Sequence, residues 1–275
     1  MEKRDYLFIL IIILVFLLKK MKKEHFVNKK IKKSVVIVGC AKNISKNLPT
    51  SLKKIDMLIS LFEKSNVIIF ENDSNDNTLE ILIKWKGQRN NIEIITDSKK
   101  TNPNLQKERT YCLSYARNLL LDKARLLKPY YFINMDLDNV IGKLDKETFL
   151  KIFDLKEKWS MIGSNNNGKY RDLWALRCKG WLEGDYHQGY KLYKKNRKVI
   201  NKNEPLIKVE SCFNGFAIYK MKFLKDCRYH GFYNNNCKIK KSRFNRQKCE
   251  HVDLHLDMIK KNNAKLFIAP FLITF

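Results

Sequence analysis

The first half of the chain alternates short apolar runs with longer segments whose apolar residues recur at helical spacing. Four runs rich in β-branched residues predict strands at 34–39, 66–70, 91–97 and 130–138. Three segments between them predict helices at 47–64, 79–86 and 106–127. Because strands and helices alternate over short connections, the pattern predicts an α/β fold with a mostly parallel central sheet and helices on both faces.

The second half of the chain is less regular. Apolar runs there predict strands at 159–165, 172–177, 211–220 and 264–275. One segment, 250–262, has helical spacing and predicts the last helix. Two stretches rich in Lys and Asn, 183–208 and 228–248, predict long polar loops.

The N-terminus carries an uninterrupted apolar run over residues 6–18, with lysines after it. A helix of this length spans about 20 Å, which is less than the ~30 Å hydrocarbon core of a bilayer. A signal-peptide core has this length, but no small-residue cleavage site follows. Since lysines can reach the interface from a short span, we expect an uncleaved single-pass membrane anchor, with a cleaved signal as the alternative. Residues 1–33 would then be anchor and linker, and 34–275 one globular domain.

The composition is that of a basic globular protein. The net charge is +27, and 44% of the residues are hydrophobic, which excludes a disordered chain. Lysine outnumbers arginine about fourfold, whereas base-reading proteins depend on arginine for two-pronged contacts to bases. We therefore expect no specific nucleic-acid partner. A basic surface would still attract phosphorylated substrates or acidic lipids.

Seven cysteines are spread along the chain, and no two of them form a CxxC pair. An odd number without close pairs does not indicate a zinc ribbon or a disulfide scaffold. Free thiols are expected, with one or two disulfides as the alternative. The cysteines are Cys40, Cys112, Cys178, Cys212, Cys227, Cys237 and Cys249.

Two carboxylates, Asp136 and Asp138, stand at the end of the fourth predicted strand. In open α/β sheets, ligands bind beyond the carboxyl ends of the strands. Two acids at such an end can hold Mg²⁺ or Mn²⁺, which prefer one or two carboxylates together with water and phosphate oxygens. A diphosphate group is therefore a candidate ligand. The alternative is that these aspartates only stabilise a turn or cap a helix.

Several blocks of the sequence resemble those of a known family. The DxD strand of GT-A nucleotide-sugar glycosyltransferases resembles YFINMDLDN here. The nucleotide-binding loop of family 2 glycosyltransferases resembles IFENDSNDNTLEIL, and the helix before their DxD resembles SYARNLLLDKA. The cryptococcal capsule-type mannosyltransferase group has blocks that resemble RDLWALRCKGW, ESCFNGFAIYK and CEHVDLH. The resemblance runs from about residue 34 to the C-terminus.

This resemblance implies a GT-A fold and a metal-dependent glycosyltransferase, with a mannosyltransferase as one form. The donor would be a nucleotide-diphospho-sugar, and the acceptor a hydroxyl of a glycan or glycoconjugate. Such enzymes of the secretory pathway usually have a lumenal domain behind the anchor, whereas the lysines after residues 6–18 favour a cytoplasmic one.

The resemblance also implies roles for individual residues. Mn²⁺ or Mg²⁺ would be bound by Asp136 and Asp138, with His251 as a third ligand or as a base. Glu250 matches the acid that serves as catalytic base in the family, while His251 replaces the family's aspartate. Gly215 would lie near one of the sugars. The side chains implied in binding the donor are Asn43, Glu71, Asp73, Arg117, Asp136 and Asn214.

Other readings of these residues are open from the sequence. Arg117 could pair with a surface acid, and Glu250 could stabilise the start of its helix. Cys237, Cys249, His251 and His255 could bind zinc, although their spacing matches no known module. Trp174 and Trp181 could stack on a sugar or pack in the core.

Two other functions compete with a glycosyltransferase. A sugar-phosphate nucleotidyltransferase also has a parallel sheet and Mg²⁺, but it needs a Gly-rich loop after the first strand, where this chain has only GCAKN. The third possibility is a basic, membrane-tethered binding protein that has no catalytic activity.

Overall fold

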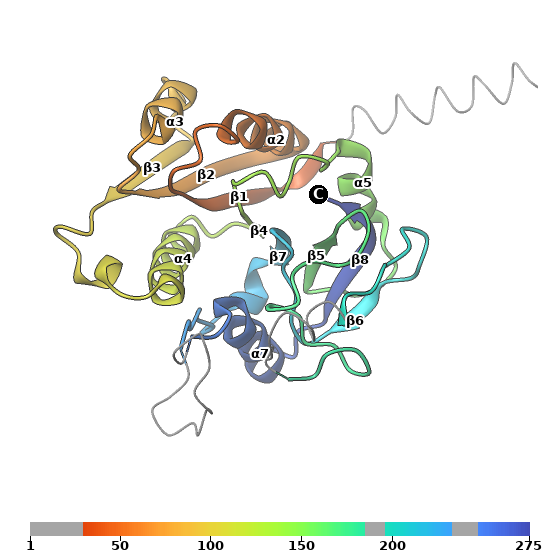
Figure 1. Ribbon diagram of the computed structural model, residues 1–275. Helices are drawn as coiled ribbons and strands as arrows, with labels where there is room; N and C mark the ends of the chain where they lie inside the picture. Colours follow the sequence, from red (N-terminus) through yellow and green to blue (C-terminus); the bar gives the residue numbers. More distant parts are fainter. Residues whose placement is uncertain (1–29, 185–195, 233–246) are drawn as a thin grey trace, which may run out of the picture.

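The computed structural model describes residues 30–184, 196–232 and 247–275 (Figure 1). Within these ranges, no helix is long and apolar enough to cross a membrane. The predicted anchor at 6–18 lies outside the described residues, and so does Cys237. The six described cysteines are all free thiols.

Eight strands form one sheet in the order β3-β2-β1-β4-β7-β5-β8-β6. Most neighbours are parallel, as predicted, but β7 runs antiparallel to β4 and β5, and β6 runs antiparallel to β8. The strands are β1 (Ile31–Ala41), β2 (Phe62–Asn72), β3 (Ile92–Asp97), β4 (Tyr131–Met135), β5 (Met161–Asn165), β6 (Ile207–Val209), β7 (Phe216–Lys220) and β8 (Leu266–Ile273).

Helices cover both faces of the sheet, as the sequence predicts. Val35 and Ile37 of β1 pack in the same core as α2, whereas Val36 and Val38 face the opposite core with α4 and α7. Figure 1 shows α2 and α3 on one side of the sheet and α4 and α7 on the other. The α-helices are α2 (Leu48–Leu61), α3 (Thr78–Lys86), α4 (Arg109–Leu126), α5 (Lys146–Leu150) and α7 (Glu250–Asn262). Three short 3₁₀ helices are η1 (Pro103–Gln106), η2 (Lys151–Asp154) and η3 (Met221–Leu224).

The predictions fail mainly between β5 and β7. The expected strand at 172–177 is a turn, in which the Asp172 carboxylate accepts a hydrogen bond from the backbone N–H of Ala175. The expected strand at 211–220 begins only at Phe216, because Asn214 and Gly215 have positive φ angles that interrupt it. The short strand β6 lies at the end of the predicted 183–208 loop.

A buried polar cluster connects α7 to the sheet. His255 of α7 is fully buried, with its Nδ1 2.9 Å from Ser211 Oγ and its Nε2 3.0 Å from Tyr219 Oη. Both ring nitrogens are therefore occupied, which contradicts the zinc alternative for this histidine. Burial lowers the pKa of His255 to about 3, so the folded protein keeps this ring neutral.

This histidine makes stability depend on pH. The unfolded chain protonates His255 near pH 6.5 and the folded protein only near pH 3, so the unfolded state binds more protons between these values. We expect the contribution of His255 to unfolding free energy to be complete above about pH 6.5 and to fall by about 1.4 kcal/mol per pH unit below it. Urea unfolding at pH 7.5, 6 and 5 would measure this. His255→Gln should reduce the slope without abolishing it, because the pKa of the buried His251 is lowered as well; an unchanged slope would contradict the account.

Candidate functional site

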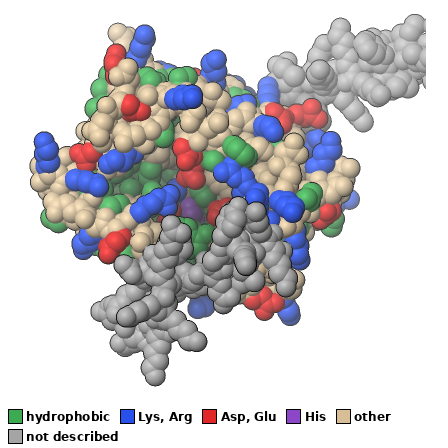
Figure 2. Space-filling model, viewed as in Figure 1, with side chains coloured by type: hydrophobic (Ala, Val, Ile, Leu, Met, Phe, Trp, Pro, Cys, Tyr) green, Lys and Arg blue, Asp and Glu red, His purple; other side chains and the backbone are tan. Residues whose placement is uncertain are grey.

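A cavity of about 700 Å³ opens beyond the carboxyl ends of β1, β2 and β4. The start of α7 and the turns before β7 and after β5 close its other sides. Figure 2 looks into this region, where acidic and basic side chains lie around a partly visible histidine. The cavity is located where the parallel half of the sheet predicts a ligand site.

Six of the nine predicted site residues line this cavity. They come from four separate parts of the chain, which the fold brings together, and they are Arg117, Asp136, Asp138, Asn214, Glu250 and His251. Gly215 and Trp174 line the cavity as well. Trp181 instead packs edge-on against Tyr170.

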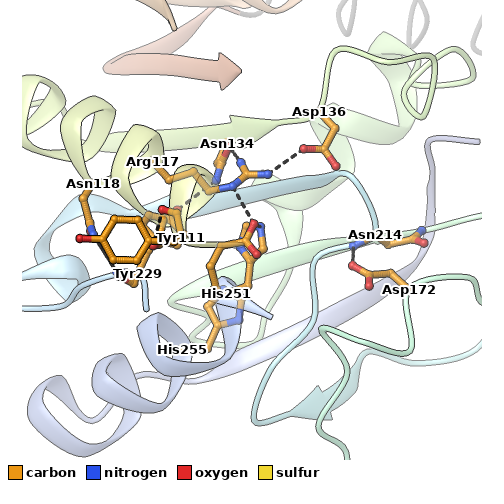
Figure 3. A network of polar contacts seen from close by, with 12 residues as sticks. Tyr111, Arg117, Asn118, Asn134, Asp136, Asp172, Asn214, Tyr229, His251 and His255 are labelled. Carbon is orange, nitrogen blue, oxygen red and sulfur yellow. Dashed lines mark hydrogen bonds and ion pairs between the residues drawn. The ribbon is translucent and has the colours of Figure 1, made fainter. Parts of the chain in front are cut away.

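Arg117 is the centre of a buried ion-pair cluster (Figure 3). Its Nε donates to Glu250 Oε1 at 3.0 Å, and its Nη2 donates to Asp136 Oδ1 at 2.9 Å. The third nitrogen, Nη1, donates to Asn134 Oδ1 at 2.7 Å. The side chains of Arg117 and Glu250 are only 4% and 5% exposed. Arg117 therefore pairs with two cavity acids, and the alternative of a surface pair is wrong.

The two aspartates after β4 differ in their surroundings. Asp136 is tied to Arg117, and its backbone N–H donates to the carbonyl of Gly215 at 2.8 Å. Asp138 is more exposed. Partial desolvation by the cavity walls still raises the pKa of Asp138, and the charge of Asp136 raises it further, while a backbone hydrogen bond and the charges of Arg109 and Arg171 lower it. A bound cation would relieve the repulsion between the two acids.

His251 is a buried, neutral ring in the cavity wall. It stacks on Phe213, with ring centroids 3.8 Å apart, and neither ring nitrogen has a hydrogen-bond partner among the described residues. Burial lowers the pKa of His251 well below its usual value, and the charge of Arg117 lowers it further. In the described ranges, no three His, Cys, Asp or Glu side chains form a group that could hold a metal. His251 thus does not complete a three-ligand set with Asp136 and Asp138.

Three predicted donor-binding residues do not line the cavity. Asn43 accepts a hydrogen bond from the backbone of Asn75, and Glu71 accepts one from the backbone of Ser74. Asp73 accepts from Ser98 Oγ and from a backbone N–H of the loop after β3. These side chains hold together the loops after β1, β2 and β3, next to the cavity. Their direct contact with a nucleotide stays a prediction.

Sequence reasoning missed five basic residues that line the cavity. They are Lys42, Lys99, Lys107, Arg109 and Arg171. In a chain with 55 basic residues, no local pattern distinguishes these five. Asp172, which also lines the cavity, was assigned to a strand instead.

Comparison of the sequence with protein-family profiles and with curated proteins gives no match. Solved structures of glycosyltransferases are similar in structure. TarS 1-349 of S. aureus, in complex with UDP-GlcNAc, is 16% identical with a TM-score of 0.47, covering 86% of this chain and 55% of that one. The mannosyltransferase PcManGT of Pyrobaculum calidifontis, with GDP-Man and Mn²⁺, is 11% identical with a TM-score of 0.44, covering 78% and 55%.

Glucosyl-3-phosphoglycerate synthase of Mycobacterium tuberculosis, with Mn²⁺, UDP and phosphoglyceric acid, is 12% identical. Its TM-score is 0.45, and the match covers 88% of this chain and 67% of that one. This chain spans little more than half the length of the TarS and mannosyltransferase chains.

Proposed function

We propose that this protein is a metal-dependent glycosyltransferase with a GT-A fold that uses a nucleotide-diphospho-sugar. The observation that carries the proposal is that two carboxylates, Asp136 and Asp138, and several basic side chains line the same cavity. Carboxylates that hold a divalent cation and cations that face it are what a diphosphate requires. The resemblance of the DxD, ARN and EH blocks supports the same reading.

Asp136 and Asp138 would hold Mn²⁺ or Mg²⁺ together with phosphate oxygens of the donor. When bound, this ion would neutralise negative charge on the departing diphosphate. The basic side chains that line the cavity, Lys42, Lys99 and Lys107 among them, would bind the remaining phosphate oxygens. Arg117 keeps Glu250 and Asp136 in fixed positions through its Nε and its Nη2.

The acceptor and the membrane association belong to the same proposal. An acceptor hydroxyl of a glycan or glycoconjugate would attack the anomeric carbon of the donor sugar, and mannose is one candidate sugar. Residues 6–18 would tether the enzyme to a membrane.

The two competing functions predict different chemistry. A sugar-phosphate nucleotidyltransferase would release pyrophosphate from a nucleoside triphosphate. A non-catalytic binding protein would bind polyanions in a salt-dependent way without turning over a nucleotide sugar. The products formed from nucleotide sugars and from nucleoside triphosphates therefore separate the three.

The test is nucleoside diphosphate release by the full chain from a panel of UDP-, GDP- and dTDP-sugars, in Mn²⁺ and in EDTA. We expect Mn²⁺-dependent release from at least one donor, with no release in EDTA. Pyrophosphate release from UTP or GTP with a sugar phosphate would favour the nucleotidyltransferase. Absence of turnover with every donor in the folded protein would contradict the proposal.

A further inference from the structure

Besides Asp138, three acidic side chains line the cavity: Asp136, Asp172 and Glu250. Their surroundings differ. Asp136 and Glu250 are both held by the guanidinium of Arg117. Asp172 instead accepts two backbone hydrogen bonds, from Asn214 N–H at 3.0 Å and from Ala175 N–H at 3.1 Å. Figure 3 shows Asp172 beside Asn214 and apart from the Arg117 cluster.

The turn that Asp172 holds also contacts the proposed metal loop. Asn214 and Gly215 adopt consecutive positive φ angles of 57° and 84°. Asp172 binds the N–H of Asn214, while the carbonyl of Gly215 accepts from the N–H of Asp136 at 2.8 Å. Since these two groups belong to adjacent residues, the turn fixes Asp172 relative to the end of β4. A Cβ on Gly215 would lie 2.4 Å from Val140, so glycine is required there.

The chemical surroundings of Asp172 suit a proton acceptor. Burial raises the pKa of its carboxyl; the two backbone hydrogen bonds lower it, and the charges of Asp136 and Glu250 raise it. A carboxylate offers about four lone-pair positions, so two backbone bonds leave room for a further donor. Beside it, the Nδ2 of Asn214 is buried and has no partner among the described residues.

The other two candidates for the base fit less well. Glu250 has a side chain only 5% exposed and is ion-paired with Arg117 through Oε1, whereas Asp172 is only partly buried and accepts its two hydrogen bonds from backbone N–H groups. His251 is stacked under Phe213 and almost fully buried.

We propose that Asp172 is the general base of the reaction, a role that rests on the proposed glycosyl transfer. As the acceptor oxygen forms its bond to the anomeric carbon, its proton passes to a carboxylate oxygen of Asp172. The bond from the anomeric carbon to the diphosphate oxygen breaks, and the diphosphate leaves with the electron pair. Atoms and charge balance without any further reactant.

The test compares an acceptor that needs a base with one that does not. Water must lose a proton when it attacks, whereas azide attacks as an anion and has no proton to lose. With the full chain, Mn²⁺ and the donor that turns over in the panel, Asp172→Asn should lower diphosphate release to water by at least about 100-fold. With azide as the acceptor, diphosphate release by Asp172→Asn should stay within about threefold of the rate of the unaltered protein, because azide needs no base.

A matched control is Asp145→Asn, since Asp145 also accepts a backbone N–H, as the N-cap of α5, but lies outside the cavity. It should leave both rates unchanged. Equal loss with water and azide in Asp172→Asn, or no loss with water, would overturn the inference. No turnover by the unaltered protein with any donor would overturn the proposed function and this inference together.

Asp172→Asn loses one acceptor of a backbone bond and could fail to fold. The unaltered protein then provides a second measurement. Its rate with water should fall as the pH is lowered and the base becomes protonated, whereas its rate with azide should not fall over the same pH range. A parallel fall with both acceptors would overturn the inference.

Discussion

Replacing Arg117 with alanine is expected to lower the free energy of unfolding by about 3–5 kcal/mol. Arg117 is 4% exposed and forms ion pairs with Asp136 and Glu250. Without it, the buried Glu250 carboxylate loses its partner, and a buried carboxyl without a partner is costly. Urea unfolding at pH 7.5 measures the difference.

Two comparisons make this expectation specific. Arg89→Ala also removes an arginine that pairs with an aspartate, but the Arg89–Asp56 pair is 40% and 45% exposed, so its loss should cost no more than about 1 kcal/mol. Adding Glu250→Ala to Arg117→Ala removes the orphaned charge and should cost less than the sum of the single changes. Equal costs for Arg117→Ala and Arg89→Ala would contradict the buried cluster.

The second large effect is expected at the proposed metal ligands. Asp138→Asn should lower Mn²⁺-dependent turnover of the donor by at least about 100-fold, because a metal ion supplies several kcal/mol of charge stabilisation and each 1.36 kcal/mol is tenfold in rate. Asp138 is the cleaner position, since Asp136→Asn would also disturb Arg117. Steady-state diphosphate release measures the loss.

The matched control for Asp138→Asn is Asp257→Asn, which removes a carboxylate from α7 that pairs with Lys261 outside the cavity. It should leave turnover unchanged. If Asp138→Asn keeps more than a third of the turnover while the protein stays folded, Asp138 is not a ligand of the catalytic metal.

The sequence predicts the fold best where one face of an element is buried. In β1, alternate residues enter opposite cores, and in α7 the apolar residues recur on one face, so the period of the pattern determines the element. The two antiparallel strands were not predicted. Strand direction depends on which edges pair, and β7 pairs with β4 and β5, which are distant from it in the sequence.

The candidate site was predicted in part for the same reason. Asp136 and Asp138 follow a recognisable strand, so the pattern locates them. Arg117 and Glu250 are 133 positions apart, so no local sequence pattern predicts their ion pair. Asp172 is stabilised by backbone groups of Asn214 and Ala175, whose positions exist only after folding. Glu71, at the end of β2, matches a nucleotide-binding motif; in the structure it accepts a hydrogen bond from the backbone of Ser74, and its contact with a nucleotide stays a prediction.

The central claim is that Asp136 and Asp138 hold a metal that binds a diphosphate, and calorimetric titration tests it most directly. The full chain would be titrated with UDP and with GDP in Mn²⁺ and in EDTA, alongside Asp138→Asn. We predict that at least one nucleoside diphosphate binds at least about tenfold more tightly with Mn²⁺, and that Asp138→Asn loses this gain. Equal affinity in Mn²⁺ and EDTA, or no binding of either nucleotide, would contradict the claim.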